Sequence, residues 1–158
     1  MLKKIIVLSL LLLGTNLVAS EASSNSNNTA QSLKKKKTLS GKNLVVFVSN
    51  GDLQVAGMGF GIALSGVKQG ANVTIVIGAN AIQYALKEGE QNIYFAKGRT
   101  PRALIQDAIK QGATVQMCSA NTDEMNLDED DFVDGVKTVI STQIFAKVFE
   151  KETRVISF

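Results

Sequence analysis

The sequence contains no histidine and only one cysteine, Cys118. Without histidine, the chain carries neither a Ser-His-Asp nor a Cys-His hydrolase site, and no imidazole can ligate zinc. A single cysteine also excludes an intramolecular disulfide. Any covalent chemistry at Cys118 must therefore be carried by the sulfur atom itself.

The first 20 residues have the layout of a secretory signal peptide. Two lysines precede an apolar run from Ile5 to Leu13, and Val18-Ala19-Ser20 offers small residues for cleavage. The run is too short to span a bilayer, which takes about 20 apolar residues. We therefore expect residues 1–20 to direct export to the periplasm and then to be removed. The alternative is an uncleaved N-terminal anchor. In an exported protein, an unpaired thiol calls for an explanation.

Residues 21–42 are predicted to form a disordered linker that leads into one folded domain at 43–158. Ser23 to Thr29 offers nothing that could be buried, and Lys34 to Lys37 adds four positive charges. These lysines would suit an anionic membrane surface or nucleic acid. Since they have no aromatic partners, a solvated linker is the favoured interpretation.

The positive net charge of the chain, +3, comes from this N-terminal part, because the domain itself is net negative. Seven of the 17 basic residues and one of the 14 acidic residues precede Asn43, which leaves 10 basic and 13 acidic residues in the domain. Such a domain lacks the basic surface that nucleic-acid binding requires.

The domain alternates between strand-like and helix-like runs, which predicts an α/β fold. We expect a three-layer sandwich with a mostly parallel sheet and helices on both faces. Apolar, β-branched runs place the strands at 44–48, 73–77, 114–118, 136–139 and 154–158. Periodicity and end signals place the helices at 55–69, 80–88, 100–112 and 142–150.

The expected helix at 55–69 is apolar around its circumference, which indicates cover on more than one side. The sheet covers one side, so we expect a second subunit on another and a homo-oligomer. The motif Gly57-Met58-Gly59-Phe60-Gly61 does not fit a dinucleotide site, because it begins well after the first strand and no acidic residue follows the second. We expect Gly57 and Gly61 to allow close packing on the sheet or on a neighbouring subunit.

Polar residues follow three of the expected strands. Because ligands of open parallel sheets bind outside the carboxyl ends of the strands, these residues are expected to line one crevice with Cys118. The alternative is that they only begin loops and cap helices. The residues are Asn50 and Asp52 after the first strand, Asn80 after the second, and Ser119 and Asn121 after the third.

Cys118 closes the third expected strand. A helix that starts directly after it would favour the thiolate, and Lys97, Arg99 and Arg102 are candidate neighbouring cations. The alternative for these three cations is a solvated loop. Met117, Cys118 and Met125 together offer three soft ligands for copper(I), which is a minor alternative because methionines are common in cores.

The acidic stretch from Asp123 to Asp134 does not match a calcium-binding loop, which needs ligands at fixed offsets and a central glycine. Asp128 is placed to begin a short helix with acidic residues in its first turn. We interpret the stretch as structural.

The domain resembles the DsrE/DsrF-like sulfur-relay family from about Lys42 to Phe158. The order and spacing of several segments carry this resemblance rather than any one motif. These segments are Asn43–Phe47, Lys68–Ala71, Val73–Ile77, Ala113–Cys118, Phe132–Val136 and Arg154–Phe158.

The resemblance implies a five-stranded parallel sheet in a flavodoxin-like sandwich and assembly into dimers, trimers or hexamers. It also implies that Cys118 carries sulfane sulfur as a persulfide, with no cofactor, and exchanges it with a donor or acceptor protein or a small sulfur compound. Two hypotheses follow from the sequence. One is a periplasmic sulfur carrier or sulfurtransferase; the other is a non-catalytic, oligomeric binding module for a small ligand or metal, in which Cys118 is structural.

Overall fold

A computed structural model describes residues 38–89, 91–92 and 98–158. The predicted signal peptide, most of the predicted linker with its run at Lys34–Lys37, and Lys97 lie outside the described residues. Within the described part of the chain, none of the helices combines the length and the apolar character needed to cross a bilayer.

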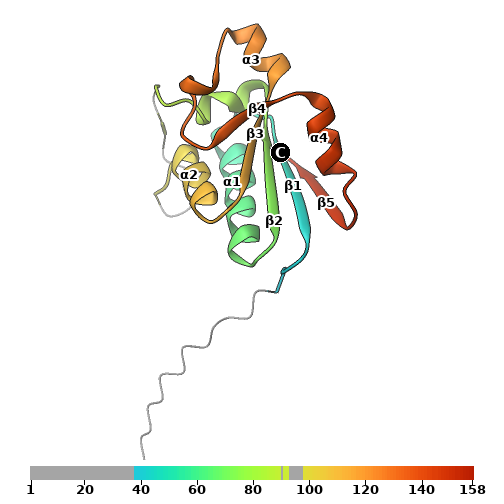
Figure 1. Ribbon diagram of the computed structural model, residues 1–158. Helices are drawn as coiled ribbons and strands as arrows, with labels where there is room; N and C mark the ends of the chain where they lie inside the picture. Colours follow the sequence, from blue (N-terminus) through green and yellow to red (C-terminus); the bar gives the residue numbers. More distant parts are fainter. Residues whose placement is uncertain (1–37, 90, 93–97) are drawn as a thin grey trace, which may run out of the picture. The chain divides into compact units, whose positions relative to one another are not determined.

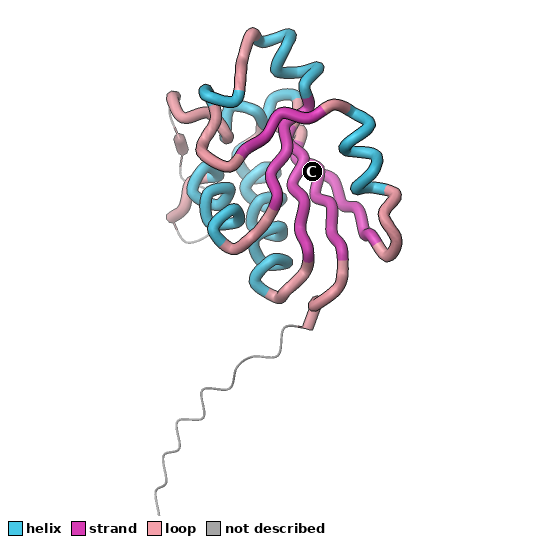
Figure 2. Tube along the Cα trace, viewed as in Figure 1, coloured by secondary structure: helices cyan, strands magenta, loops and turns pink. Residues whose placement is uncertain are grey.

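Five parallel strands form a single sheet (Figures 1 and 2). Its order is β4-β3-β2-β1-β5, and each neighbouring pair runs parallel. The sequence prediction of the strands is confirmed to within one residue at each end. The strands are β1 (Asn43–Val48), β2 (Asn72–Ile77), β3 (Thr114–Cys118), β4 (Val136–Val139) and β5 (Thr153–Ser157).

Helices cover both faces of the sheet, so the predicted α/β sandwich is confirmed. The first two α-helices pack on one face around the larger apolar core, and the last packs on the other face around a smaller one. The third lies beyond the carboxyl ends of the strands (Figure 1). The helices are α1 (Leu53–Lys68), α2 (Pro101–Lys110), α3 (Ser119–Met125) and α4 (Ser141–Val148), with short 3-10 helices η1 (Ala79–Tyr84) and η2 (Glu129–Asp131).

Local capping explains where two of the helices begin. The carboxylate of Asp52 accepts the N–H groups of Gln54 and Val55 at the start of α1. The Thr100 hydroxyl accepts the N–H of Ala103, with Pro101 in the first turn of α2. These side chains satisfy N–H groups that have no partner inside the helix.

The helix expected at 80–88 is shorter than predicted and is a 3-10 helix, η1. Ala79 starts it in the left-handed region, with φ of 46°. After Tyr84 the chain turns to form a bridge between Leu86 and Phe132. The segment is therefore held by pairing with the loop before β4 rather than by helical periodicity.

Gly59 and Gly66 allow α1 to pack closely on the sheet. A methyl group at Gly59 would lie 2.9 Å from Val48 Cγ2, and one at Gly66 would lie 3.1 Å from Leu44 Cδ2. At Gly61 a methyl group would meet nothing within 4 Å, so the expectation that Gly61 packs closely on the sheet is wrong. The alternative, a close contact of Gly61 with a neighbouring subunit, stays a prediction.

The sheet and α2 cover most of α1, which leaves Met58 and Ile62 as its exposed large apolar residues. The apolar circumference of α1 therefore does not by itself require a second subunit. Further exposed apolar side chains lie on and beside α4 and β5: Ile140, Phe145, Phe149, Val155 and Ile156.

Residues 38–42, expected in the linker, form a turn that packs on the domain. Leu39 donates its N–H to Gln69 O at 3.0 Å and contacts the core. Lys42 forms an ion pair with Glu152 at 3.0 Å. The ordered domain therefore begins before Asn43.

The acidic stretch has a structural part, as the sequence predicted. Asp128 caps η2, and Glu129 accepts hydrogen bonds from Lys137 Nζ and from the N–H of Thr138 in β4. The Lys137 hydrogen bond, followed by that from Thr138, lowers the pKa of the Glu129 carboxyl. This carboxylate therefore stays charged at the outer edge of β4.

Replacing Gly59 by alanine is expected to lower the free energy of unfolding by about 1 kcal/mol, because overpacking costs about 1–3 kcal/mol and exceeds the gain in helix propensity. Gly61→Ala is the matched control in the same helix. It is expected to raise stability by about 0.5–1 kcal/mol, since its methyl group enters open space. Urea unfolding followed by circular dichroism measures both changes, and equal stabilisation by both variants would contradict the packing of α1 on β1.

Candidate functional site

A polar cleft lies at the carboxyl ends of β1 and β2, between the starts of α1 and η1 and the side of α3. Its volume is about 780 Å³, within the usual range of about 300–1,000 Å³ for small-ligand pockets. The residues that line it are Asn50, Gly51, Asp52, Ala79, Asn80, Gln83, Asn121, Glu124 and Met125.

The cleft brings together four of the five polar residues that the sequence placed in a crevice: Asn50, Asp52, Asn80 and Asn121. The fifth, Ser119, does not line it, and neither does Cys118. The interpretation of these residues as caps also applies, because Asp52 caps α1 and its N–H is held by Asn50 Oδ1 at 2.8 Å. Capping and lining the cleft are compatible because the start of α1 forms one wall.

The wall near Gly51 is closely packed and hydrogen-bonded. Tyr84 donates its hydroxyl to Gly51 O at 2.7 Å, and Gln83 Nε2 donates to Asn80 O at 2.9 Å. A methyl group at Gly51 would lie 2.7 Å from Asn80 Cβ. Burial, and secondly the charge of Asp52, raise the pKa of Tyr84, so its hydroxyl remains a donor at neutral pH.

Asn121 joins α3 to the end of β2. Its Oδ1 accepts the N–H of Ala79 at 3.2 Å, at the residue whose φ of 46° lies in the left-handed region. Such a conformation is unfavourable for alanine by about 1–3 kcal/mol. The bond from Asn121 helps to hold this turn at the mouth of the cleft.

Cys118 lies on the opposite face of the sheet from the main core. Side chains alternate along β3, so Val115 and Met117 enter the main core, while Cys118 packs against the smaller apolar cluster on the α4 side. This cluster consists of Val45, Val76, Val139 and Ile144. The thiol is free and half-buried. The helix α3 begins at the next residue, and the thiol does not cap it.

The two described candidate cations have other partners. Arg99 forms an ion pair with Asp107 of α2. Arg102 donates to Glu88 O at 2.7 Å and to Gly89 O at 3.3 Å. Both belong to the α2 side of the sheet, so the prediction that they tune the Cys118 sulfur is wrong.

The three sulfurs considered for copper do not converge. Met117 is fully buried in the main core, Cys118 faces the α4 side, and Met125 lies in the polar cleft. The described residues also contain no group of three or more Asp, Glu or Cys side chains arranged to hold a metal ion. The sulfur set therefore does not form a copper site.

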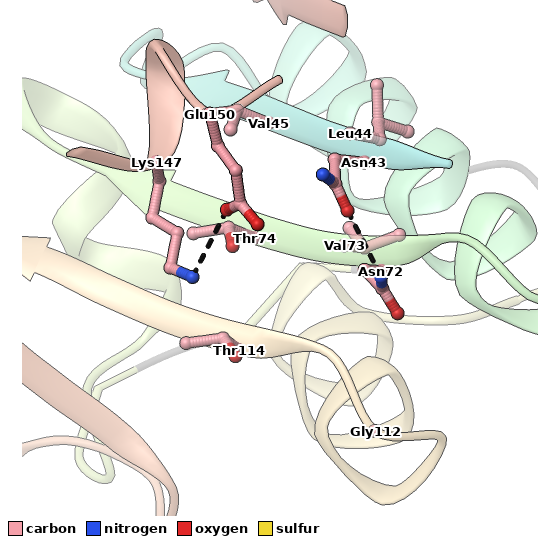
Figure 3. Close-up of a pocket in the computed structure, with 10 residues that line it drawn as sticks. All are labelled: Asn43, Leu44, Val45, Asn72, Val73, Thr74, Gly112, Thr114, Lys147 and Glu150. Carbon is pink, nitrogen blue, oxygen red and sulfur yellow. Dashed lines mark hydrogen bonds and ion pairs between the residues drawn. The ribbon is translucent and has the colours of Figure 1, made fainter. Parts of the chain in front are cut away.

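A second, smaller hollow of about 230 Å³ opens at the other end of the strands (Figure 3). Asn43 and Asn72 are hydrogen-bonded at 3.0 Å on one side of it, and Lys147 and Glu150 of the α4 end form an ion pair at 3.4 Å on another. This hollow lies at the amino ends of β1, β2 and β3, whereas ligands of parallel sheets bind at the carboxyl ends.

Sequence reasoning did not assign Gln83, Glu124 and Met125 to the cleft. Gln83 joins it because η1 is a 3-10 helix, in which residues three apart stand on one side, and Asn80 is three residues earlier. Glu124 and Met125 join it through α3, which is tied to the end of β2 by the hydrogen bond that Ala79 N–H donates to Asn121 Oδ1. An Asn-x-x-Gln spacing after a strand is the signal that could have found Gln83.

The comparisons with known proteins agree with this architecture. The YchN protein of E. coli has a similar structure, with a TM-score of 0.62 and 14% identity over 74% of this chain and 98% of that one. A protein of unknown function from Methanobacterium thermoautotrophicum, MTH1491, gives a TM-score of 0.55 and 14% identity over 74% and 99%. A search of curated protein sequences gave no significant match. The sequence model of the DsrE/DsrF-like family matches residues 42–158, and the chain therefore belongs to the DsrE/DsrF-like family.

Proposed function

We propose that this protein is a periplasmic sulfur carrier or sulfurtransferase in which Cys118 accepts and donates sulfane sulfur as a persulfide. The observation that carries the proposal is a free, half-buried thiol at the carboxyl end of β3 in a member of this family. The chain has no second cysteine to resolve a persulfide as a disulfide. The bound sulfur therefore leaves to an external acceptor.

The transfer step needs no cofactor. The Cys118 thiolate attacks the outer sulfur of a donor persulfide, R–S–SH, and the donor S–S bond breaks as the new one forms. The products are Cys118–S–SH and the thiolate R–S⁻, so electrons balance without an external oxidant. Delivery repeats the step, with an acceptor thiolate attacking the outer sulfur of Cys118.

The surroundings of Cys118 suit a sulfur that is held and then passed on. The apolar cluster on the α4 side, which includes Val139 and Ile144, packs against it and shields one side of the thiol from water. Its partial exposure leaves another side open to a small donor or to an exposed persulfide of a protein partner. Polarizable sulfur tolerates such an apolar neighbourhood.

Export forms part of the proposal and is supported by the signal-like layout of residues 1–20. The donor and acceptor would then be sulfur compounds or proteins of the periplasm. Assembly into a homo-oligomer also belongs to the proposal, and the apolar side chains exposed on and beside α4 and β5 support it.

Incubation with polysulfide, or with thiosulfate and a thiol, is expected to add about 32 Da to the chain, confined to the peptide that contains Cys118. Cyanide is expected to remove this mass as thiocyanate. Intact-protein and peptide mass spectrometry under non-reducing conditions measure both steps. Cys118→Ser is the control and should gain no mass. An unmodified wild-type chain under every donor would exclude the persulfide.

The cleft supports a second candidate function, the binding of a small polar ligand. Four amide side chains and the carboxylates of Asp52 and Glu124 line it, and its lining contains no lysine or arginine among the described residues. Asp52 also occupies the N-terminal N–H groups of α1 that would otherwise attract an anion. The cleft therefore favours cationic or neutral ligands over anions such as thiosulfate.

In a titration followed by NMR, spermidine as a cationic probe is expected to shift the amide signals of Asn50, Asn80 and Asn121, and thiosulfate is not. Glu124→Gln should weaken spermidine binding by roughly 3- to 10-fold, since it removes one carboxylate from an exposed wall. Glu150→Gln, at the smaller hollow, is the matched control and should leave the affinity unchanged. A cleft that responds to thiosulfate but not to spermidine would contradict this charge selectivity.

A further inference from the structure

The two edges of the sheet differ in how they are protected. At β4, the carboxylate of Glu129 accepts the outward N–H of Thr138 at 2.9 Å, and Lys137 Nζ at 2.8 Å. The outer edge of β4 therefore has its exposed N–H satisfied within the chain and carries charges of both signs. Edges blocked in this way do not accept a further strand.

The outer edge of β5 is open beyond its first residue, Thr153, whose N–H donates to Glu150 O at 3.1 Å. The N–H of Phe158 donates to Phe47 O at 2.9 Å, and Phe158 O accepts the N–H of Ser49 at 3.0 Å. Because residues alternate along a parallel strand, Ile156 and Arg154 also face β1, and Val155 and Ser157 turn their N–H and C=O groups outward. Within the described residues no hydrogen bond reaches the N–H of Val155 or Ser157.

The side chains of β5 also suit a partner. Val155 is 45% exposed on the α4 face, and Ile156 is exposed on the face that carries α1. The strand has no proline, and Arg154 is its only charged residue. A β-branched strand with an open edge and half-exposed apolar side chains is a template for pairing.

We propose that β5 pairs antiparallel with β5 of a second copy of this chain, about a two-fold axis beside Val155. In this register Val155 stands opposite the partner subunit's Val155, and the two exchange both backbone hydrogen bonds. Ser157 stands opposite the partner subunit's Thr153, whose C=O accepts its N–H. The pairing therefore satisfies the outward N–H groups of β5.

The observations favour a second copy over an unrelated strand. The register is self-complementary, and it sets Arg154 opposite the partner subunit's Ile156, so no like charges meet. Because the edge of β4 is blocked, pairing stops after one step and gives a closed dimer with one continuous sheet. This inference goes beyond the sulfur chemistry of Cys118 and does not depend on it.

The same arrangement covers part of the apolar surface beside β5. A two-fold axis perpendicular to the sheet places both α4 helices on the same face, one on each side of the seam. Phe145 lies in α4, and Phe149 directly follows this helix. Both side chains are exposed, Phe149 by 82%, and their ring centroids lie 6.4 Å apart. The pairing therefore brings two copies of this exposed aromatic pair to the same face of the continuous sheet.

Sedimentation velocity of the purified chain over a range of concentrations is expected to show a dimer or a multiple of it. Val155→Lys places two like charges opposite each other and should raise the dissociation constant at least roughly tenfold. Met58→Lys is the matched control, because Met58 on α1 is 46% exposed and receives the same charge. This control should leave the assembly unchanged.

A cross-link tests the register directly. Paired residues of this kind lie about 5.5 Å apart between Cα atoms, within the range of about 4.4–6.8 Å for disulfides. In a Cys118→Ser background, Val155→Cys should oxidise to a covalent dimer on a non-reducing gel, and Met58→Cys should not. A monomeric wild type would overturn the proposal, as would an assembly that survives Val155→Lys or is broken by Met58→Lys.

Discussion

The fixed register of β3 between β2 and β4 is the constraint on which the rest of the site depends. Both neighbours hydrogen-bond to β3, so the strand cannot slip by a residue without turning its core side chains to the other face. Met117 is consequently held in the main core and Cys118 on the α4 side. The position of the thiol is therefore a property of the sheet, not of a flexible loop.

This register separates the two candidate activities. The polar cleft is formed by the loops after β1 and β2 and by the side of α3, whereas the thiol lies on the face of the sheet that α4 covers. A ligand in the cleft therefore need not touch the sulfur, and a persulfide need not occupy the cleft. Only α3 belongs to both regions, since it starts directly after Cys118 and contributes Asn121 and Glu124 to the cleft.

Most of the fold follows from the sequence because buried parallel strands read as continuous apolar runs, and each of the five was found. That the same edge of the sheet carries Asn50, Asp52, Asn80 and Asn121 follows from the parallel topology alone, because all four come after the carboxyl ends of strands. Which side of that edge Cys118 faces depends on strand register, which no local pattern reports. The contact of Gly59 rather than Gly61 similarly depends on how α1 is rotated on the sheet. The left-handed Ala79, which starts η1, also has no local signal, because alanine ordinarily favours helix.

The acidic stretch shows why composition alone undervalues such residues. From composition alone, Glu129 and the neighbouring acidic residues would be interpreted as a solvated surface. In the fold, the Glu129 carboxylate accepts hydrogen bonds along the outer edge of β4 and so protects that edge. No such carboxylate protects the outer edge of β5 among the described residues, although the apolar side chains of Val155 and Ile156 are exposed there. An unprotected apolar edge promotes aggregation, so the difference between the two edges calls for a physical explanation. Pairing of β5 with β5 of a second copy removes that hazard, because it satisfies the outward N–H groups of the strand and covers its exposed apolar side chains.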